Sequence, residues 1–184
     1  MTSLQEVNLL KNKLEKLPER IGLMSSLQKL EVANNYLRAL PITFAALNLM
    51  QRIDVECNKL QVLPENLDNL TSCTTIICNY NELLRLPRCL GAMPSLTSLS
   101  ATNNKINYIP QEVTDCKTLK ILRLSLNKIT NVPDKLGSMK RLRELTIDYN
   151  NLYKLPMSFY QLVKIKTLRI EGNENLSDPP PDII

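Results

Sequence analysis

Apolar residues recur along this chain in a pattern that repeats every 23 residues. Within each repeat, the apolar residues at positions 4 and 6 alternate with other residues, as Leu122 and Leu124 do, which predicts a short half-buried strand. Apolar residues also occupy positions 1, 11, 14, 18 and 21. One repeat is too small to bury this set alone, so the repeats must stack on one another and place their strands in a parallel sheet. The repeats begin at Leu4, Leu27, Met50, Cys73, Leu96, Leu119, Leu142 and Ile165.

Asparagine and proline also keep the 23-residue interval, from Asn12 to Asn173 and from Pro18 to Pro179. Proline fixes φ and opposes a regular helix at the residue before it. The side opposite the sheet is therefore expected to be extended or to form short helical turns, such as Glu19 to Met24 and Asp134 to Met139. In the last repeat Leu176 comes one residue late, which predicts an irregular terminal repeat.

The shared form LxxLxLxxNxLxxLPxxhxxh, with h apolar, resembles the leucine-rich-repeat family in its intracellular 23-residue LPxxI type. It is similar to the repeats of Ras-binding scaffolds and of Scribble-like and Roco-type proteins, and it covers essentially the whole chain. The resemblance implies one α/β solenoid domain over residues 1–184. It would form a horseshoe with the parallel β-sheet on its concave face and short turns or 3-10 segments on its convex face. It also implies that each repeated Asn bonds backbone groups, so that replacement by Ala costs roughly 1–3 kcal/mol.

Solenoids need polar caps at both ends to stay soluble. No segment that could cover the first repeat precedes Leu4, and the last repeat stops near Ile184. The sequence is therefore expected to be an excerpt of a longer protein, or to have its ends covered by a partner. The alternative is a complete protein with a frayed first strand.

Composition favours a reduced, cytoplasmic protein. The five cysteines form neither a CxxC pair nor a disulfide framework, and no apolar run approaches the roughly 20 residues of a membrane span. Three cysteines occupy inward repeat positions, while Cys57 falls on the concave face and Cys89 on the convex side. A thiol nucleophile usually needs a histidine base, and the chain has no histidine. No catalytic residue, cofactor or metal site is predicted.

Positions 3, 5, 7 and 8 of each repeat are expected to project from the concave sheet. On this face apolar or aromatic side chains stand among small polar ones, which is typical of interface anchors. Isolated apolar surface residues are also ordinary, so the same pattern is compatible with no partner. The mixed charges of the first repeats, such as Lys29 and Glu31, are interpreted as cross-strand pairs. The candidate partner-binding residues are Ile77, Tyr80, Ser100, Ile121, Arg123, Leu126, Tyr149 and Arg169.

Charge on the concave face argues against nucleic acid as a partner. The face carries seven acidic and five basic side chains, although the whole chain has a net charge of +5, and a phosphate backbone needs accumulated positive charge. The surplus bases fall at positions 22, 23 and 2 and predict a basic rim. An acidic partner surface or anionic lipid could use this rim, but a solvated face that aids solubility is the favoured explanation. The rim residues are Lys117, Lys120, Lys140, Arg141, Arg143, Lys164 and Lys166.

These observations favour a non-catalytic protein-interaction module in an intracellular signalling or scaffold protein. Its partner would be a small GTPase or a catalytic domain of the same protein. One alternative is the substrate-recognition or regulatory arm of a multidomain enzyme, beside a GTPase, kinase, phosphatase or ubiquitin-ligase module. Another is a structural spacer, which would use its ends or convex side. The repeat frame is set by the fold and does not identify the partner.

Overall fold

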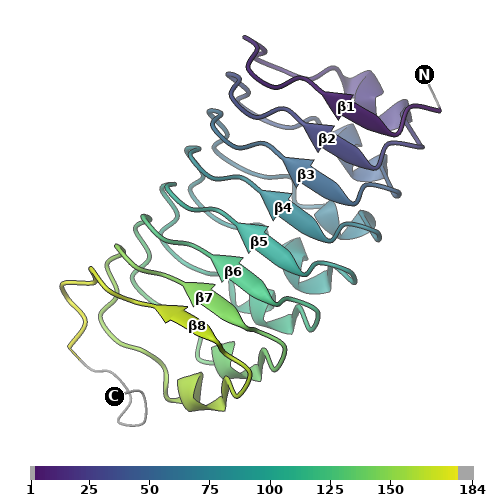
Figure 1. Cartoon of the computed structure of the whole chain (residues 1–184). Helices are drawn as coiled ribbons and strands as arrows, with labels where there is room; N and C mark the ends of the chain where they lie inside the picture. Colours follow the sequence, from purple (N-terminus) through teal and green to yellow (C-terminus); the bar gives the residue numbers. More distant parts are fainter. Residues whose placement is uncertain (1–2, 178–184) are drawn as a thin grey trace.

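The computed structural model describes residues 3–177, which form a solenoid with one strand in each of its eight repeats. The strands pair in parallel and in sequence order, so the sheet runs along one whole side of the molecule (Figure 1). The residues of the sequence beyond 177, including Pro179, lie outside the described part. The strands are β1 (Glu6–Asn8), β2 (Lys29–Glu31), β3 (Arg52–Asp54), β4 (Thr75–Ile77), β5 (Ser98–Ser100), β6 (Ile121–Arg123), β7 (Glu144–Thr146) and β8 (Thr167–Arg169).

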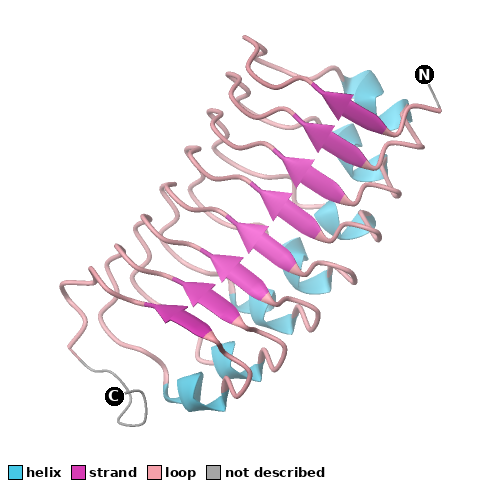
Figure 2. Ribbon diagram, in the orientation of Figure 1, coloured by secondary structure: helices cyan, strands magenta, loops and turns pink. Residues whose placement is uncertain are grey.

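Short 3-10 turns lie on the side opposite the sheet (Figure 2). Pro18 has an extended backbone, with φ −70° and ψ 145°, and η1 begins at the next residue. The predicted turn at Glu19 is confirmed. The second predicted turn also begins at Asp134, but its 3-10 part covers only three residues. The turns are η1 (Glu19–Leu23), η2 (Ile42–Ala46), η3 (Leu67–Asn69), η4 (Arg88–Ala92), η5 (Gln111–Asp115), η6 (Leu136–Ser138) and η7 (Met157–Gln161).

The strand register keeps each residue beside its equivalent 23 positions later. Leu30 pairs with Ile53 in β3, for example, and the same offset holds across the sheet. Each strand has three residues, so position 4 lies inside it and position 6 just after it. Hydrogen bonding continues past the strand, because the Val32 amide donates to the Asp54 carbonyl at 2.9 Å. The predicted alternation is therefore confirmed, with its second apolar residue outside the strand.

The repeated asparagines form the predicted ladder. Asn127 Nδ2 donates to the Leu124 carbonyl at 3.0 Å and to the Ala101 carbonyl of the preceding repeat at 2.9 Å. Its Oδ1 accepts a 3.0 Å bond from the Ile106 amide. The ladder asparagines therefore satisfy backbone groups at the turn out of each strand and link neighbouring repeats. Equivalent bonds are made by Asn35, Asn58, Asn81, Asn104, Asn150 and Asn173.

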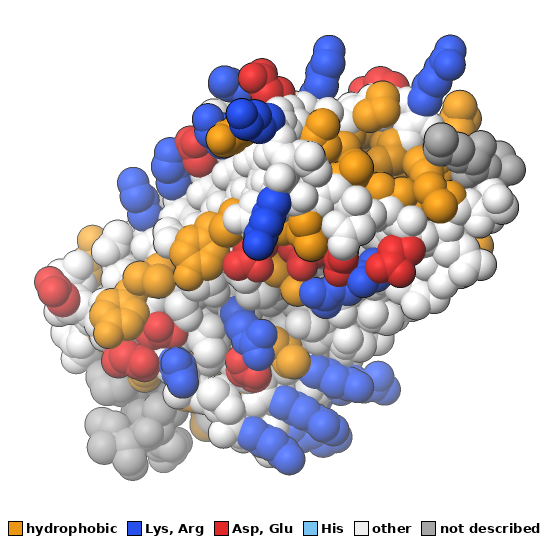
Figure 3. Space-filling view, turned by 45° about the horizontal axis from the view of Figure 1, so that its top comes forward, with side chains coloured by type: hydrophobic (Ala, Val, Ile, Leu, Met, Phe, Trp, Pro, Cys, Tyr) orange, Lys and Arg blue, Asp and Glu red, His pale blue; other side chains and the backbone are white. Residues whose placement is uncertain are grey.

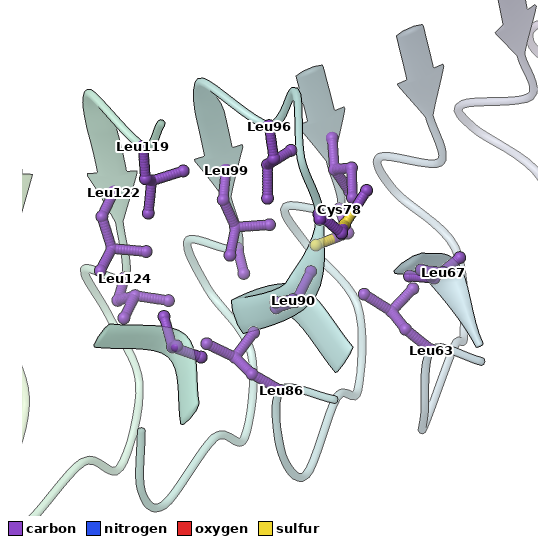
Figure 4. Close-up of a cluster of buried hydrophobic side chains, with 14 of the residues drawn as sticks. Leu63, Leu67, Cys78, Leu86, Leu90, Leu96, Leu99, Leu119, Leu122 and Leu124 are labelled. Carbon is purple, nitrogen blue, oxygen red and sulfur yellow. The ribbon is translucent and has the colours of Figure 1, made fainter. Parts of the chain in front are cut away.

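The buried residues form one continuous core between the sheet and the turns. Figure 4 shows leucines from successive repeats, including Leu99, Leu122 and Leu124, together with Cys78 in this core. The predicted inward positions are confirmed. The first repeat is less protected, since Leu4 is 39% exposed and Val7 is only half-buried. It has a neighbouring repeat on one side only within the described residues, so less apolar area is removed from water there.

Candidate functional site

Three of the candidate residues are exposed apolar side chains at repeat position 8, where the chain leaves the concave sheet. Tyr80, Leu126 and Tyr149 are 49%, 46% and 55% exposed. Leu126 and Tyr149 come from adjacent repeats, while Asn103 separates Leu126 from Tyr80 in the same column. Figure 3 shows a row of hydrophobic side chains that runs from the C-terminal end towards the middle of the molecule and is bordered by charged ones, and a larger hydrophobic area near the N-terminal end. We call Tyr80, Leu126 and Tyr149 the apolar edge.

The backbone at position 8 is left-handed in every repeat. The φ angle is 52° at Tyr80, 56° at Leu126 and 52° at Tyr149. Residues with a side chain rarely adopt this region, although Asn and Gly adopt it more readily. The left-handed turn brings the following Asn under the end of the strand, where it bonds backbone groups. Position 8 in the other repeats carries Lys11, Asn34, Cys57, Asn103 and Gly172.

Tyr149 lies against the next repeat. A side chain at Gly172 would place its Cβ only 2.5 Å from Cδ1 of Tyr149, so the ring lies over this glycine. One face of the ring is thus supported while the rest of the side chain is open to solvent. The arrangement gives the C-terminal part of the apolar edge a fixed aromatic surface.

The other two apolar candidates do not join this edge. Ile77 in β4 and Ile121 in β6 are both half-buried. Ile77 pairs with Ser100, whereas Ile121 lies between Ser98 and Glu144. Each therefore has polar neighbours within its own row of the sheet, and the sequence-based grouping of all five apolar residues is only partly realised.

The expectation that Ser100 would face a partner is wrong. Only 5% of Ser100 is exposed, and its Oγ donates a 2.7 Å hydrogen bond to Asn79 Oδ1. The Thr102 amide donates to the same oxygen at 2.9 Å. Neighbouring side chains on the sheet cover this short residue, an effect that alternation along a single strand does not reveal.

A second short polar network lies beside it and was missed at the sequence level. Ser125 Oγ bonds Asp148 Oδ1 at 2.5 Å and Thr146 Oγ1 at 2.9 Å. All three residues are more than 90% buried, although the repeat pattern places them on the concave face. Their small size was the available signal, because short side chains beside longer ones are easily covered. The side chains at the centre of the concave face are therefore short and polar, and the apolar edge lies beside them.

The two candidate arginines differ in their surroundings. Arg123 makes a two-pronged ion pair with Glu144, with Nε–Oε1 and Nη2–Oε2 distances of 2.6 and 3.1 Å. This hydrogen bonding raises the pKa of Arg123 above its usual value. Arg169 is exposed and forms no ion pair within the described residues. Arg169 is thus the more available of the two for a partner.

The charges of the first repeats pair mostly with one another. Lys29 contacts Glu6 across the strands at 2.7 Å and Glu31 in its own strand at 2.9 Å. Arg52 contacts Asp54 at 3.3 Å within β3. The cross-strand interpretation holds for Lys29 and Glu6, while each of the other two pairs lies within a single strand. Such pairs satisfy charge within the sheet itself.

All seven residues of the predicted basic rim are exposed. Figure 3 shows Lys and Arg side chains gathered along the lower edge of the molecule. The rim lies where the chain enters the later strands, at the opposite end of these strands from the apolar edge. Four of its members, Lys120, Arg141, Arg143 and Lys164, line a common hollow of about 230 Å³.

Four of the five cysteines have a raised pKa. Burial raises the pKa of Cys73 and of Cys78 to about 12, and it also raises the pKa of Cys89. Burial raises the pKa of Cys57 as well, with Glu56 and Asp54 adding to the effect. A reactive thiol needs a lowered pKa. Within residues 3–177 there is also no cluster of three or more metal-ligating side chains, and no helix suited to crossing a membrane.

Comparison with known proteins agrees with this architecture. Residues 117–174 match the family described as "Leucine rich repeat". No curated protein matches the chain in sequence. Solved structures do match: a leucine-rich-repeat protein of Leptospira interrogans is 31% identical with a TM-score of 0.88, over 94% of this chain and 47% of its own. This chain therefore spans about half the length of that protein.

Two further structures share the fold. The leucine-rich repeat domain of the type III effector XopL is 25% identical with a TM-score of 0.89, covering 99% of this chain and 65% of its own. A plant peptide hormone receptor, RGFR1, solved in complex with RGF2, is 23% identical with a TM-score of 0.84. That match covers 95% of this chain and 31% of the receptor. The predicted solenoid is thus confirmed as a leucine-rich-repeat fold.

Proposed function

Given its leucine-rich-repeat solenoid fold, we propose that the chain is a non-catalytic module that binds a protein partner on its concave face. Repeats of this kind commonly serve protein recognition, and RGFR1, which shares the fold, was solved with its hormone bound. The apolar edge would anchor the partner. The observation that carries the proposal is the presence of exposed Tyr and Leu side chains at left-handed backbone positions.

The energetic argument starts from the cost of these positions. A left-handed conformation costs a residue with a side chain roughly 1–2 kcal/mol, and Asn or Gly reduces that cost. The repeats with Asn34, Asn103 and Gly172 show that both residue types fit this backbone. At Tyr80 and Leu126 the chain retains a large apolar side chain that is about half exposed. Folding alone does not account for that choice, whereas contact with a partner does.

The surroundings of the apolar edge define the partner's chemistry. Tyrosine combines a large apolar ring with a hydroxyl group and is enriched at interface hot spots. The Tyr149 amide donates to the Glu171 carbonyl at 2.8 Å, and the exposed side chains of Arg169 and Glu171 in that next repeat supply charges of both signs. A folded protein surface with an apolar protrusion and a mixed polar border would fit this face. A small GTPase or a catalytic domain of the same cytoplasmic signalling or scaffold protein is the form of partner we propose.

The experiment compares two double variants as bait in a cell lysate. The variant Tyr80→Asn/Tyr149→Asn removes both rings and introduces asparagine, which tolerates a backbone φ near 50°. Tyr108→Asn with Tyr153→Asn is the matched control, because these tyrosines are 41% and 54% exposed at repeat positions beyond the ladder asparagines. Captured proteins are quantified by mass spectrometry, and binding of each is then measured with purified components.

We expect the concave double variant to weaken binding of a directly bound partner by at least about tenfold, equivalent to about 1.4 kcal/mol. The control should change it less than about twofold. If both variants bind every captured partner as the parent does, the partner does not use the concave face. That result would favour contacts at the convex side or the ends.

A further inference from the structure

The basic rim contains a local concentration of positive charge that the protein-binding proposal does not use. Lys120, Arg143 and Lys166 occupy the same position in successive repeats. The Arg143 amide bonds the Lys120 carbonyl at 2.8 Å, and the Lys166 amide bonds the Arg143 carbonyl at 2.7 Å. Their backbones are therefore directly adjacent, about 4.8 Å apart as in any sheet. Arg141 and Lys164 occupy another shared position, two residues earlier in each repeat.

Four of these side chains meet around one space. The hollow of about 230 Å³ is lined by Lys120, Arg141, Arg143 and Lys164. Within residues 3–177, none of the four side chains hydrogen-bonds or ion-pairs with another protein group. We call this space the basic hollow.

Two of the three other rim residues, and the acidic residue next to Arg143, are already engaged. Lys117 lies 3.8 Å from Asp115 and also bonds the Thr114 carbonyl, and Lys140 bonds the Gln161 carbonyl. Glu144 is held by Arg123 through two hydrogen bonds. The four cations of the basic hollow thus repel one another without a described acidic group between them. A bound anion would relieve this repulsion.

We infer that the basic hollow binds a multiply charged phosphate group. Two guanidinium groups offer planar forks that match phosphate oxygens, while two ammonium groups add point charges around them. A phosphate carries up to two negative charges and several acceptor oxygens in a compact volume, whereas a carboxylate carries one charge. Four convergent cations therefore suit phosphate better than a single acidic side chain. A soluble phosphorylated molecule and a lipid headgroup share this chemistry.

The first test uses inorganic pyrophosphate as the probe and isothermal titration calorimetry at constant ionic strength. The parent chain is compared with Lys120→Gln/Arg143→Gln. Lys16→Gln/Lys128→Gln is the control, because it removes the same charge from exposed lysines outside the basic hollow. Circular dichroism melting checks that each variant is folded.

One pyrophosphate should bind per chain, and the hollow variant should lose at least about tenfold in affinity, since two charge-assisted contacts disappear. The control should lose less than about twofold. Equal weakening in both variants would overturn the inference, because it would show a diffuse effect of net charge. An absence of saturable binding by the parent chain would also overturn it, because it would show that no site exists.

The second test identifies the source of the phosphate. Phosphatidylcholine vesicles containing phosphatidylinositol bisphosphate are compared with phosphatidylcholine vesicles in which phosphatidylserine supplies the same total negative charge. Binding to the first vesicles alone, with competition by pyrophosphate, supports a lipid headgroup as the source. Pyrophosphate binding without vesicle binding supports a soluble phosphorylated ligand. Equal binding to both vesicle types that is insensitive to Lys120→Gln/Arg143→Gln contradicts a phosphate site.

Discussion

Each ladder asparagine serves both its own repeat and the preceding one. Asn127 is buried, and its side chain donates to carbonyl groups in two repeats and accepts from the Ile106 amide. Asn12 donates only to the Leu9 and Leu10 carbonyls of its own repeat, and it is exposed. Removal of a buried partner leaves backbone groups without a hydrogen bond and without water. The same substitution should therefore have different effects at these two sites.

Asn127→Ala should lower the free energy of unfolding by about 1–3 kcal/mol, because buried backbone groups lose their partners. Asn12→Ala should lower it by less than about 1 kcal/mol, because water replaces the lost bonds. Urea unfolding followed by circular dichroism measures both values. Equal losses at the two sites would show that the ladder bonds between repeats add little stability.

At Leu126, backbone conformation and side-chain chemistry conflict. Leu126→Asn should leave the free energy of unfolding unchanged or raise it by up to about 1 kcal/mol, because Asn tolerates the left-handed region. Leu126→Ala should lower it, because Ala keeps the backbone cost and loses the contacts of leucine. The comparison again uses urea unfolding. A loss of stability as large in the Asn variant as in the Ala variant would indicate that Leu126 is retained for packing.

The sequence predicts the inward residues and the ladder asparagines, because their spacing is strict. It does not predict the left-handed backbone at position 8, where Lys11, Cys57 and Tyr80 stand among Asn and Gly residues. The requirement comes from the shared backbone path and not from the residue at any one site. Ser100 was misplaced for a related reason, since its burial depends on Asn79 in the neighbouring repeat.

At the scale of the elements, the convex turns approach one another closely where glycine permits it. A Cβ at Gly137 in η6 would overlap the Ser158 carbonyl of η7, and a Cβ at Gly91 in η4 would overlap the Glu112 carbonyl of η5. Other repeats carry Ala45 or Thr114 at this position. The spacing between turns is thus set locally by the residue at position 19.

Gly137→Ala should lower the free energy of unfolding by about 1–3 kcal/mol, because η6 and η7 must move apart to admit the methyl group. Ala45→Gly in η2 provides the opposite comparison at an equivalent position, with an expected loss of roughly 1 kcal/mol or less. Thermal and urea unfolding would check both. An unchanged stability of the Gly137 variant would mean that the turns separate freely.

The turn positions were predicted from the prolines, but their lengths were not. Proline sets where η1 begins, because Pro18 is extended and Glu19 starts the turn. The 3-10 segment η6 begins only at Leu136, and Asp134 and Lys135 before it form a turn. Sequence therefore locates these elements better than it defines their ends.

On the scale of the whole molecule, the repeat converts sequence spacing into surface columns. Residues 23 positions apart become neighbours across the sheet, so the basic rim could be placed from sequence. The meeting of four cations in one hollow depends on side-chain conformations and needed the structure. The same holds for the apolar edge, since Ile77 and Ile121 were grouped with it but lie in separate rows.

The most direct test of concave binding is hydrogen exchange of the chain with and without a bound protein partner, read by mass spectrometry. We predict slower exchange in the complex over 75–80, 121–126 and 144–149, which contain the apolar edge and its strands. The convex turns at 88–92 and 157–161 should exchange at the same rate in both samples. Protection confined to those turns, with the concave segments unchanged, would contradict the proposed binding face.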